Sequence, residues 1–148
     1  MKAPLLIGTD LTAASDATLA TLGNQGAIAI NQDRLGVQGT LKKYDPNGAY
    51  SLWSGPLSGG CTVGLAIHLG PDSVVPAAWA AATLKPTATA SVSITATWEE
   101  LGIKAGTSVS VVDVWSNATV AAKASGTFTF NVAISHGNAF YKFCPLFV

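Results

Sequence analysis

The side chains of this sequence that could act in chemistry are few and are not clustered. Eight acidic residues, two histidines and two cysteines are spread over 148 residues. His68 and His136 have no accompanying ligand pattern, so we expect no metal site. No serine lies in a G-x-S-x-G setting, which argues against a serine hydrolase. These residues therefore predict no metal, no cofactor and no catalytic group in this chain.

Asp10 and the run Asn31-Gln32-Asp33 are the polar groups that most resemble site residues. Asp10 follows a short apolar run, where its carboxylate either lines a binding pocket or caps and orders a loop. We favour the ordering role. We likewise expect residues 31–33 to satisfy backbone groups rather than to act in catalysis.

The two cysteines and one tripeptide bear on the compartment in which the protein works. Cys61 and Cys144 have no metal-ligand spacing and no CxxC pattern. A disulfide between them would close a loop of about 80 residues and stabilise the fold by restricting the unfolded chain. Two buried free thiols are the alternative, and the sequence leaves both open. The tripeptide Asn117-Ala118-Thr119 is an N-glycosylation acceptor in a secretory compartment.

Four tryptophans carry rings that could stack on a sugar. Trp53, Trp98 and Trp115 lie in or at the end of predicted strands, which favours packing in a core or between domains. Trp79 lies in an irregular stretch and is the one that we expect to be exposed.

The elements that must position these residues change in character near residue 36. The continuously apolar run Leu5–Ile7 is typical of a strand buried on both faces of a parallel sheet. Ser15 is a plausible N-cap for a helix that runs to Leu22. Gly23 or Asn24 can then end this helix in a left-handed conformation. One such β/α unit cannot cover Leu5–Ile7 by itself.

After residue 36 the sequence reads as strands and turns. Apolar alternation and turn punctuation predict an antiparallel β-sandwich. In the turn 45–48, Pro46 presets φ and Gly48 accepts a positive φ. The segment 70–90 contains three prolines and does not fit the series, so we interpret it as an irregular loop. The predicted strands are Thr40–Tyr44, Tyr50–Ser54, Cys61–Leu69, Ser91–Trp98, Val109–Trp115, Gly126–Val132 and Ala139–Phe143.

Composition excludes some partners. The formal net charge is zero with 11% charged residues, so no basic stripe exists for nucleic acid. No apolar run approaches the roughly 18 residues of a membrane span. The start resembles a signal peptide, but Pro4 and the short apolar run argue against one. We therefore expect any export signal of a secreted parent protein to lie before Met1.

Four blocks of the sequence together resemble the C-terminal third of family 27 glycoside hydrolases, the α-galactosidases and α-N-acetylgalactosaminidases. Their order and spacing carry the resemblance, and they span most of the chain. The segment 70–90 departs from the family pattern, which has a short turn there. The four blocks are KAPLLIGTDL at 2–11, AIAINQDRLGVQG at 27–39, LWSGPLSG at 52–59 and Ser135-His136.

The resemblance implies a fold in two parts. Residues 1–36 would be the last β/α unit of an incomplete (β/α)8 barrel, and residues 37–148 an antiparallel β-sandwich. A complete barrel needs about 250 residues, so this chain is too short to hold one. Asp10 would then lie at the end of the last barrel strand, and it is the single candidate for a substrate-binding residue.

The resemblance also implies an activity, the retaining hydrolysis of terminal α-linked galactose by two carboxylates. In the family both are aspartates on earlier barrel strands, and none of the eight acidic residues here lies in a matching motif. We therefore expect a chain that is inactive alone, with the N-terminal barrel and an α-galactoside as partners of a secreted parent enzyme. The alternative is a stand-alone β-sandwich that binds carbohydrate or is purely structural. The acidic residues are Asp10, Asp16, Asp33, Asp45, Asp72, Asp113, Glu99 and Glu100.

Overall fold

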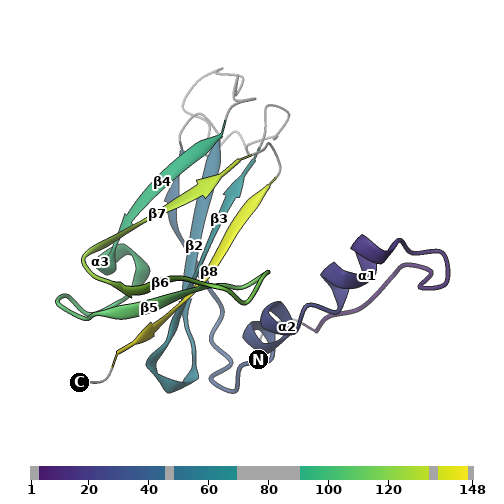
Figure 1. The fold of residues 1–148 in the computed structure, drawn as a ribbon, viewed down its shortest axis with the longest axis horizontal. Helices are drawn as coiled ribbons and strands as arrows, with labels where there is room; N and C mark the ends of the chain where they lie inside the picture. Colours follow the sequence, from purple (N-terminus) through teal and green to yellow (C-terminus); the bar gives the residue numbers. More distant parts are fainter. Residues whose placement is uncertain (1–3, 46–48, 70–90, 134–136, 147–148) are drawn as a thin grey trace.

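The computed structural model describes residues 4–45, 49–69, 91–133 and 137–146. Within them, a six-stranded sheet in the order β1-β2-β3-β8-β5-β6 lies beside a two-stranded sheet of β4 and β7. All pairings are antiparallel. Figure 1 shows the eight strands as one body, with two helices of the N-terminal segment standing to one side. The predicted mostly-β antiparallel architecture is confirmed.

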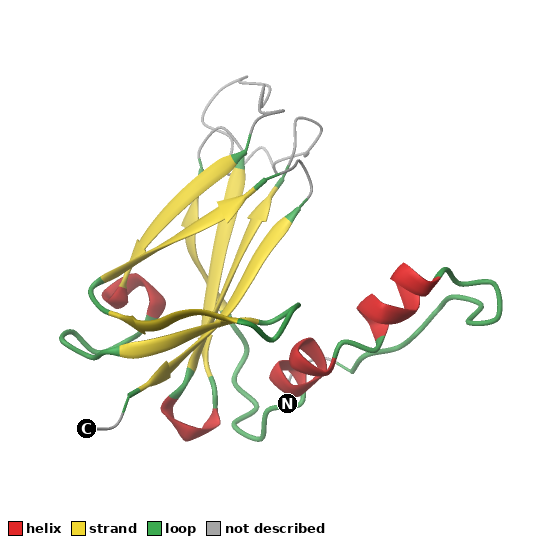
Figure 2. Cartoon of the chain, in the orientation of Figure 1, coloured by secondary structure: helices red, strands yellow, loops and turns green. Residues whose placement is uncertain are grey.

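Figure 2 shows the helices in red and the strands in yellow, and seven of the eight described strands lie close to the predicted ranges. The strands are β1 Thr40–Tyr44, β2 Tyr50–Pro56, β3 Thr62–His68, β4 Val92–Thr97, β5 Val109–Asp113, β6 Thr119–Ala124, β7 Thr127–Val132 and β8 Asn138–Pro145. The helical elements are α1 Asp16–Leu22, α2 Gln25–Asn31, the short 3-10 turn η1 Ser58–Gly60 and α3 Trp98–Leu101.

The core lies between the two sheets. Ile94 and Ala96 of β4 alternate with exposed threonines and are buried, as their period of two predicts. Phe130 of β7 is fully buried and packs against Phe143 of β8 with ring centroids 6.0 Å apart. Phe128 joins both rings in edge-on contacts. These aromatic rings close the space between the sheets.

Trp98 is buried as expected, but it begins a helix instead of ending a strand. The Thr97 hydroxyl caps α3 by accepting a hydrogen bond from the Glu100 N–H, and the Glu100 carboxylate accepts one from the Thr97 N–H. This reciprocal capping box satisfies two backbone N–H groups that the helix cannot pair. Gly102 then ends α3 with φ 75°, a conformation that glycine adopts without strain.

Strand β6 was not among the predicted strands. Its sequence Thr-Val-Ala-Ala-Lys-Ala has little β-branched or aromatic character, and most of its residues are exposed. The strand forms because its backbone pairs with β5. Sequence pattern finds half-buried strands, and β6 buries too little side chain to show the pattern.

The N-terminal segment differs most from prediction. Ser15 caps α1, as expected, by accepting a hydrogen bond from the Thr18 N–H. The expected left-handed end is wrong, because Gly23 has φ −90°. Asn24 instead caps a second short helix, α2, which was not predicted. The chain therefore turns from α1 directly into α2.

Leu5–Ile7 form no strand, which corrects the predicted buried strand. All three side chains are exposed, Leu6 by 91%. A strand of a parallel sheet takes its backbone hydrogen bonds from two neighbours. The described part of the chain offers no such neighbours to residues 5–7.

The described helices include none that is long and apolar enough to cross a membrane. The predicted loop 70–90, with Trp79, lies outside the described residues, as does most of the predicted turn 45–48. On the described side of that turn, the Asp45 carboxylate accepts a hydrogen bond from the Ala49 N–H at 3.0 Å.

Candidate functional site

Asp10 lies in an exposed loop and orders it. Its carboxylate accepts hydrogen bonds from the Thr12 N–H at 2.9 Å and from the Thr12 hydroxyl at 2.7 Å. These bonds, the hydroxyl's first, hold the pKa of Asp10 below its ordinary value. Such local bonds are the loop-ordering role favoured from the sequence. A contact between Asp10 and the substrate stays a prediction.

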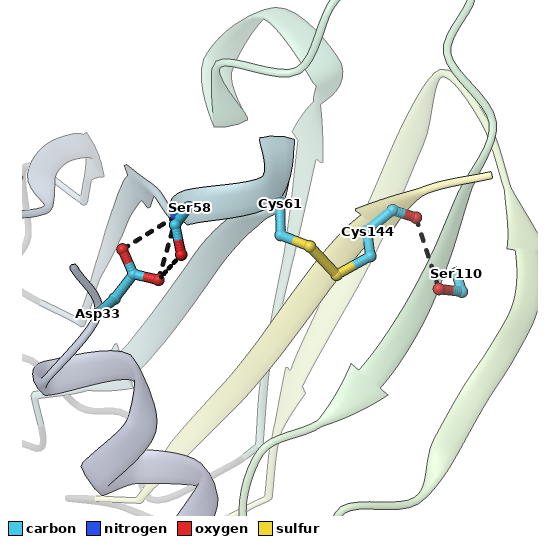
Figure 3. The surroundings of a disulfide bond; sticks show 5 residues. All are labelled: Asp33, Ser58, Cys61, Ser110 and Cys144. Atoms are coloured by element: carbon cyan, nitrogen blue, oxygen red, sulfur yellow. Dashed lines mark hydrogen bonds between the residues drawn. A yellow bond between two sulfur atoms is a disulfide. The ribbon is translucent and has the colours of Figure 1, made fainter. Parts of the chain in front are cut away.

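Asp33 ties the N-terminal segment to the sandwich. Its carboxylate accepts hydrogen bonds from the Ser58 N–H at 2.9 Å and from the Ser58 hydroxyl at 2.6 Å, as Figure 3 shows. It also accepts one from the Leu35 N–H. This is the backbone-satisfying role expected for residues 31–33. Asn31 is the last residue of α2, and Gln32 caps its C-terminal end.

A disulfide joins Cys61 and Cys144 beside this contact. Their Cα atoms are 4.3 Å apart, and the bond links the chain just before β3 to the end of β8 (Figure 3). The loop between β2 and β3 is thus held by Asp33 on one side and by the disulfide on the other.

Of the three described tryptophans, one is a core residue and two are partly exposed. Trp98 is buried and donates its indole N–H to the Thr107 carbonyl at 2.8 Å. Trp53 and Trp115 are each 37% exposed. Trp115 donates its indole N–H to the Asn138 side-chain oxygen at 2.7 Å. These two rings lie on the junction with α2 or near it, which suits contact between the parts of the chain.

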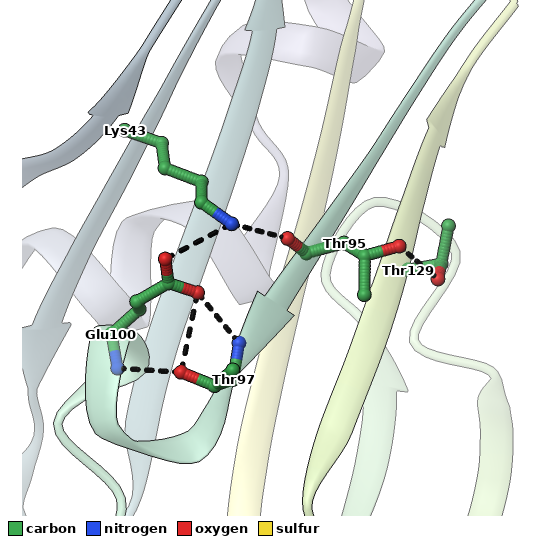
Figure 4. A network of polar contacts seen from close by, with 5 residues as sticks. All are labelled: Lys43, Thr95, Thr97, Glu100 and Thr129. Atoms are coloured by element: carbon green, nitrogen blue, oxygen red, sulfur yellow. Dashed lines mark hydrogen bonds and ion pairs between the residues drawn. The ribbon is translucent and has the colours of Figure 1, made fainter.

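Other carboxylates bind groups in turns and at a helix cap. Glu100 forms an ion pair with Lys43 at 3.0 Å in addition to its capping bonds with Thr97 (Figure 4). The Thr97 N–H first, and then Lys43, lower the pKa of Glu100. Asp113 accepts hydrogen bonds from the N–H and hydroxyl of Ser116. Asp16 and Glu99 lie in the first turns of α1 and α3, and Asp72 lies outside the described residues.

The histidines do not form a metal site in the described residues, which contain no group of three potential ligands among histidine, cysteine, aspartate and glutamate. His68 is fully buried in β3. His136 lies outside the described residues.

The most unusual feature is an apolar face on the N-terminal segment. Leu5, Leu6 and Ile7 are 57%, 91% and 53% exposed. Together with α1 and α2 they line a groove of about 610 Å³, into which Leu22 and Ile28 also project. Single exposed apolar residues are common, but a contiguous apolar patch of this kind marks a contact surface. Sequence reasoning found this surface through Leu5–Ile7.

Helix α2, which lines part of this groove, contacts the sandwich near the end of β5. The Asn24 side chain donates a hydrogen bond to the Trp115 carbonyl at 2.9 Å. Gly26 lets α2 approach closely, because a Cβ there would lie 2.5 Å from the Val114 carbonyl oxygen. These two contacts attach α2 to the sandwich.

Comparison with known proteins identifies the family. Residues 47–143 match the family model described as the alpha galactosidase C-terminal beta sandwich domain. Alpha-galactosidase 3 of Arabidopsis thaliana is 40% identical over 133 residues, which cover 89% of this chain and 26% of that protein. The alpha-galactosidase of Cyamopsis tetragonoloba is 35% identical over 118 residues, covering 80% of this chain and 24% of that protein.

Solved structures share the fold of this chain. Alpha-galactosidase I from Mortierella vinacea matches with a TM-score of 0.74 at 23% identity, covering 95% of this chain and 31% of that one. A putative alpha-galactosidase/melibiase from Bacteroides fragilis matches with a TM-score of 0.69 at 26% identity, covering 95% and 25%. This chain spans about a quarter of the length of the curated relatives. The resemblance in the sequence blocks is confirmed, and the chain belongs to the α-galactosidase family, whose C-terminal β-sandwich domain it contains.

Proposed function

We propose that these 148 residues are the C-terminal part of a secreted, retaining α-galactosidase that hydrolyses terminal α-linked galactose. The β-sandwich braces the catalytic barrel, and residues 1–36 complete the barrel with its last β/α unit. The substrate, an α-galactoside, is bound by the whole enzyme. The exposed apolar face of Leu5–Ile7 is the observation that carries this proposal.

The apolar face supports a barrel as the missing partner in two ways. Burial of each aliphatic side chain would contribute about 1.5–3 kcal/mol, so a stable protein covers such residues. The backbone of residues 5–7 also needs partners, and neighbouring parallel strands supply both needs at once. The relatives that match this chain are more than three times its length, which leaves room for a barrel.

The described carboxylates support a chain that does not act alone. A retaining glycosidase needs two carboxyl groups about 5–5.5 Å apart across the sugar. Asp10, Asp113 and Glu100 bind N–H and hydroxyl groups two or three residues away in loops and a helix cap. Asp33 binds Ser58 and joins the N-terminal segment to the sandwich. We therefore expect the catalytic pair to come from a part of the enzyme outside these residues.

A chimera tests the proposal. The Arabidopsis alpha-galactosidase 3 chain would be cut before the region that matches this chain, and the 148 residues would be fused in its place. We expect the truncated relative to be inactive and the chimera to hydrolyse a chromogenic α-galactoside. The isolated 148-residue chain should show no turnover. A soluble chimera without turnover, or an isolated chain with turnover, contradicts the proposal.

Two leucines give a matched pair of variants in the chimera. Leu6→Asp alters the apolar face, and since Leu6 is almost fully exposed the isolated chain should fold as before. Leu146→Asp changes another exposed leucine, which directly follows β8. We expect Leu6→Asp to abolish chimera activity and Leu146→Asp to retain it. If both variants lose the same activity, the apolar face is not what joins the chain to the barrel.

The alternative of a stand-alone β-sandwich predicts a different surface in solution. On our proposal the isolated 148-residue chain binds a dye specific for exposed apolar surface, and Leu6→Asp reduces the signal. A well-folded monomer that binds no such dye would favour the stand-alone module.

The disulfide supports a secreted parent enzyme. Structural disulfides persist in oxidising compartments and are rare in the cytosol. On this proposal, alkylation of the protein from its natural source finds neither Cys61 nor Cys144 free.

A further inference from the structure

The turn between β5 and β6 carries a modification signal that the proposed activity does not use. Asn117-Ala118-Thr119 is the only Asn-x-Ser/Thr tripeptide in the 148 residues. Residues 115–120 are all exposed. The acceptor asparagine therefore lies on the surface, within a turn, instead of inside a strand or the core.

The turn is held by groups other than the Asn117 side chain. The Asp113 N–H donates to the Ala118 carbonyl at 2.9 Å and closes the turn. The Asp113 carboxylate accepts bonds of 2.8 Å from both the N–H and the hydroxyl of Ser116. Asn117 adopts φ 57°, a left-handed conformation that asparagine tolerates better than most residues. A substituent on the Asn117 amide would break none of these bonds.

The fold leaves room for a large substituent at this position. Thr119 begins β6, which is the last strand of its sheet and has β5 as its only neighbour in the described structure. A free sheet edge can pair with the strands of other chains, and a bulky hydrophilic group beside the edge would hinder such pairing.

The disulfide is an independent observation that points to the same compartment. Cys61 and Cys144 are joined far from this turn in sequence, and such bonds form where N-glycosylation also occurs. A tripeptide that could arise by chance thus coincides with an exposed turn and an oxidised cysteine pair.

We propose that Asn117 carries an N-linked oligosaccharide. The donor is a polyprenyl-diphosphate-linked oligosaccharide. The Asn117 side-chain nitrogen forms a bond to the anomeric carbon of the first sugar and loses one proton, while the bond from that carbon to the diphosphate oxygen breaks. The polyprenyl diphosphate leaves, and no oxidation or reduction takes place. The site rests on the secretory location proposed above, but not on glycosidase activity.

Expression of the chain behind an appended signal peptide in a eukaryotic host tests the site itself, because the signal peptide imposes the compartment. We expect one oligosaccharide per chain, seen as a single downward gel shift after treatment with a peptide:N-glycosidase. The tryptic peptide 105–123 contains one asparagine, so mass spectrometry assigns the position without ambiguity. The denatured gel shift does not depend on how well the isolated chain folds.

Substitutions within the tripeptide test whether the acceptor signal itself is required. Asn117→Gln and Thr119→Ala should abolish the shift, whereas Thr119→Ser keeps a hydroxyl at the third position and should retain it. Absence of the shift in the wild-type chain, while a host glycoprotein in the same cells is modified, overturns the site. A glycan that persists in Asn117→Gln overturns it as well. A secreted chain that stays unmodified, while the intracellular chain carries the sugar, also overturns it.

Discussion

Gly64 offers a sharp test of how the sandwich core is packed. It lies in the middle of β3, paired with Ser54 of β2 and Tyr141 of β8. A Cβ added at Gly64 would lie 2.7 Å from one carbon of the Phe130 ring and 3.3 Å from the Phe143 ring. Both rings are buried, and Phe130 is inaccessible to solvent. Glycine is therefore required here by space.

The cost of Gly64→Ala follows from this overlap. Overpacking of a well-filled core costs about 1–3 kcal/mol. Alanine leaves the unfolded chain fewer conformations than glycine does, and this effect alone stabilises the fold by about 0.4–1 kcal/mol. The net loss of unfolding free energy is about 1–2 kcal/mol. For a chain of this length that corresponds to a fall in Tm of roughly 3–6 °C.

Thermal and urea unfolding of the chain, followed by circular dichroism, measures the change. Gly8→Ala is the matched control, because a Cβ at Gly8 would have no neighbour within 4 Å. It should change the unfolding free energy by less than about 0.5 kcal/mol. An unchanged or raised Tm for Gly64→Ala would refute the packing argument.

A second substitution tests the cause. Phe130→Leu leaves space where the Gly64→Ala methyl group would clash, so the double variant should be more stable than the sum of the two single losses predicts. Residues in direct contact couple in this way by about 0.5–3 kcal/mol. Strict additivity would mean that the Phe130 ring is not what the methyl group meets.

Two further predictions concern the disulfide and a capping carboxylate. Cys144→Ser opens a cross-link with a sequence separation of 83 residues and should lower the unfolding free energy by about 4.5 kcal/mol in the chain-entropy estimate. Urea unfolding with and without reductant checks this: reductant should destabilise the wild type and leave the variant unchanged, and an equal response of both would contradict it. Glu100 has a pKa below its ordinary value of 4.5, first through the Thr97 N–H and then through Lys43, so its stabilising contribution is present above about pH 4.5 and is lost as pH falls through the lowered pKa. Glu100→Gln should therefore flatten this part of the profile of Tm against pH between 3 and 7, whereas parallel acid losses in wild type and variant would refute it.

Much of the sandwich could be predicted because its signals are local. In β4, Ile94 and Ala96 alternate with exposed threonines, and this pattern needs one buried face and one solvated face. The helix start at Ser15 was likewise visible, since its side chain bonds a neighbouring N–H three residues on. Asp33 was correctly placed among groups that satisfy the backbone, although its partner Ser58 could not be named.

Other features could not be predicted because distant parts of the chain decide them. Strand β6 exists through its pairing with β5, and its alanine-rich sequence carries no pattern of its own. Asn24 fits the end of α1 and the start of α2 equally well in the sequence. In the structure its side chain accepts a hydrogen bond from the Ala27 N–H and caps α2. The close approach at Gly26 is invisible in sequence for the same reason.

The sequence by itself determined the family, the antiparallel character of the sandwich and the apolar nature of Leu5–Ile7, because these rest on residue types and on periods of a few residues. The tertiary structure decided that Cys61 and Cys144 are bonded and that Leu5–Ile7 form no strand. Both outcomes depend on which backbones lie side by side. A disulfide needs two Cα atoms brought within several ångströms, and a parallel strand needs neighbours to bond its backbone.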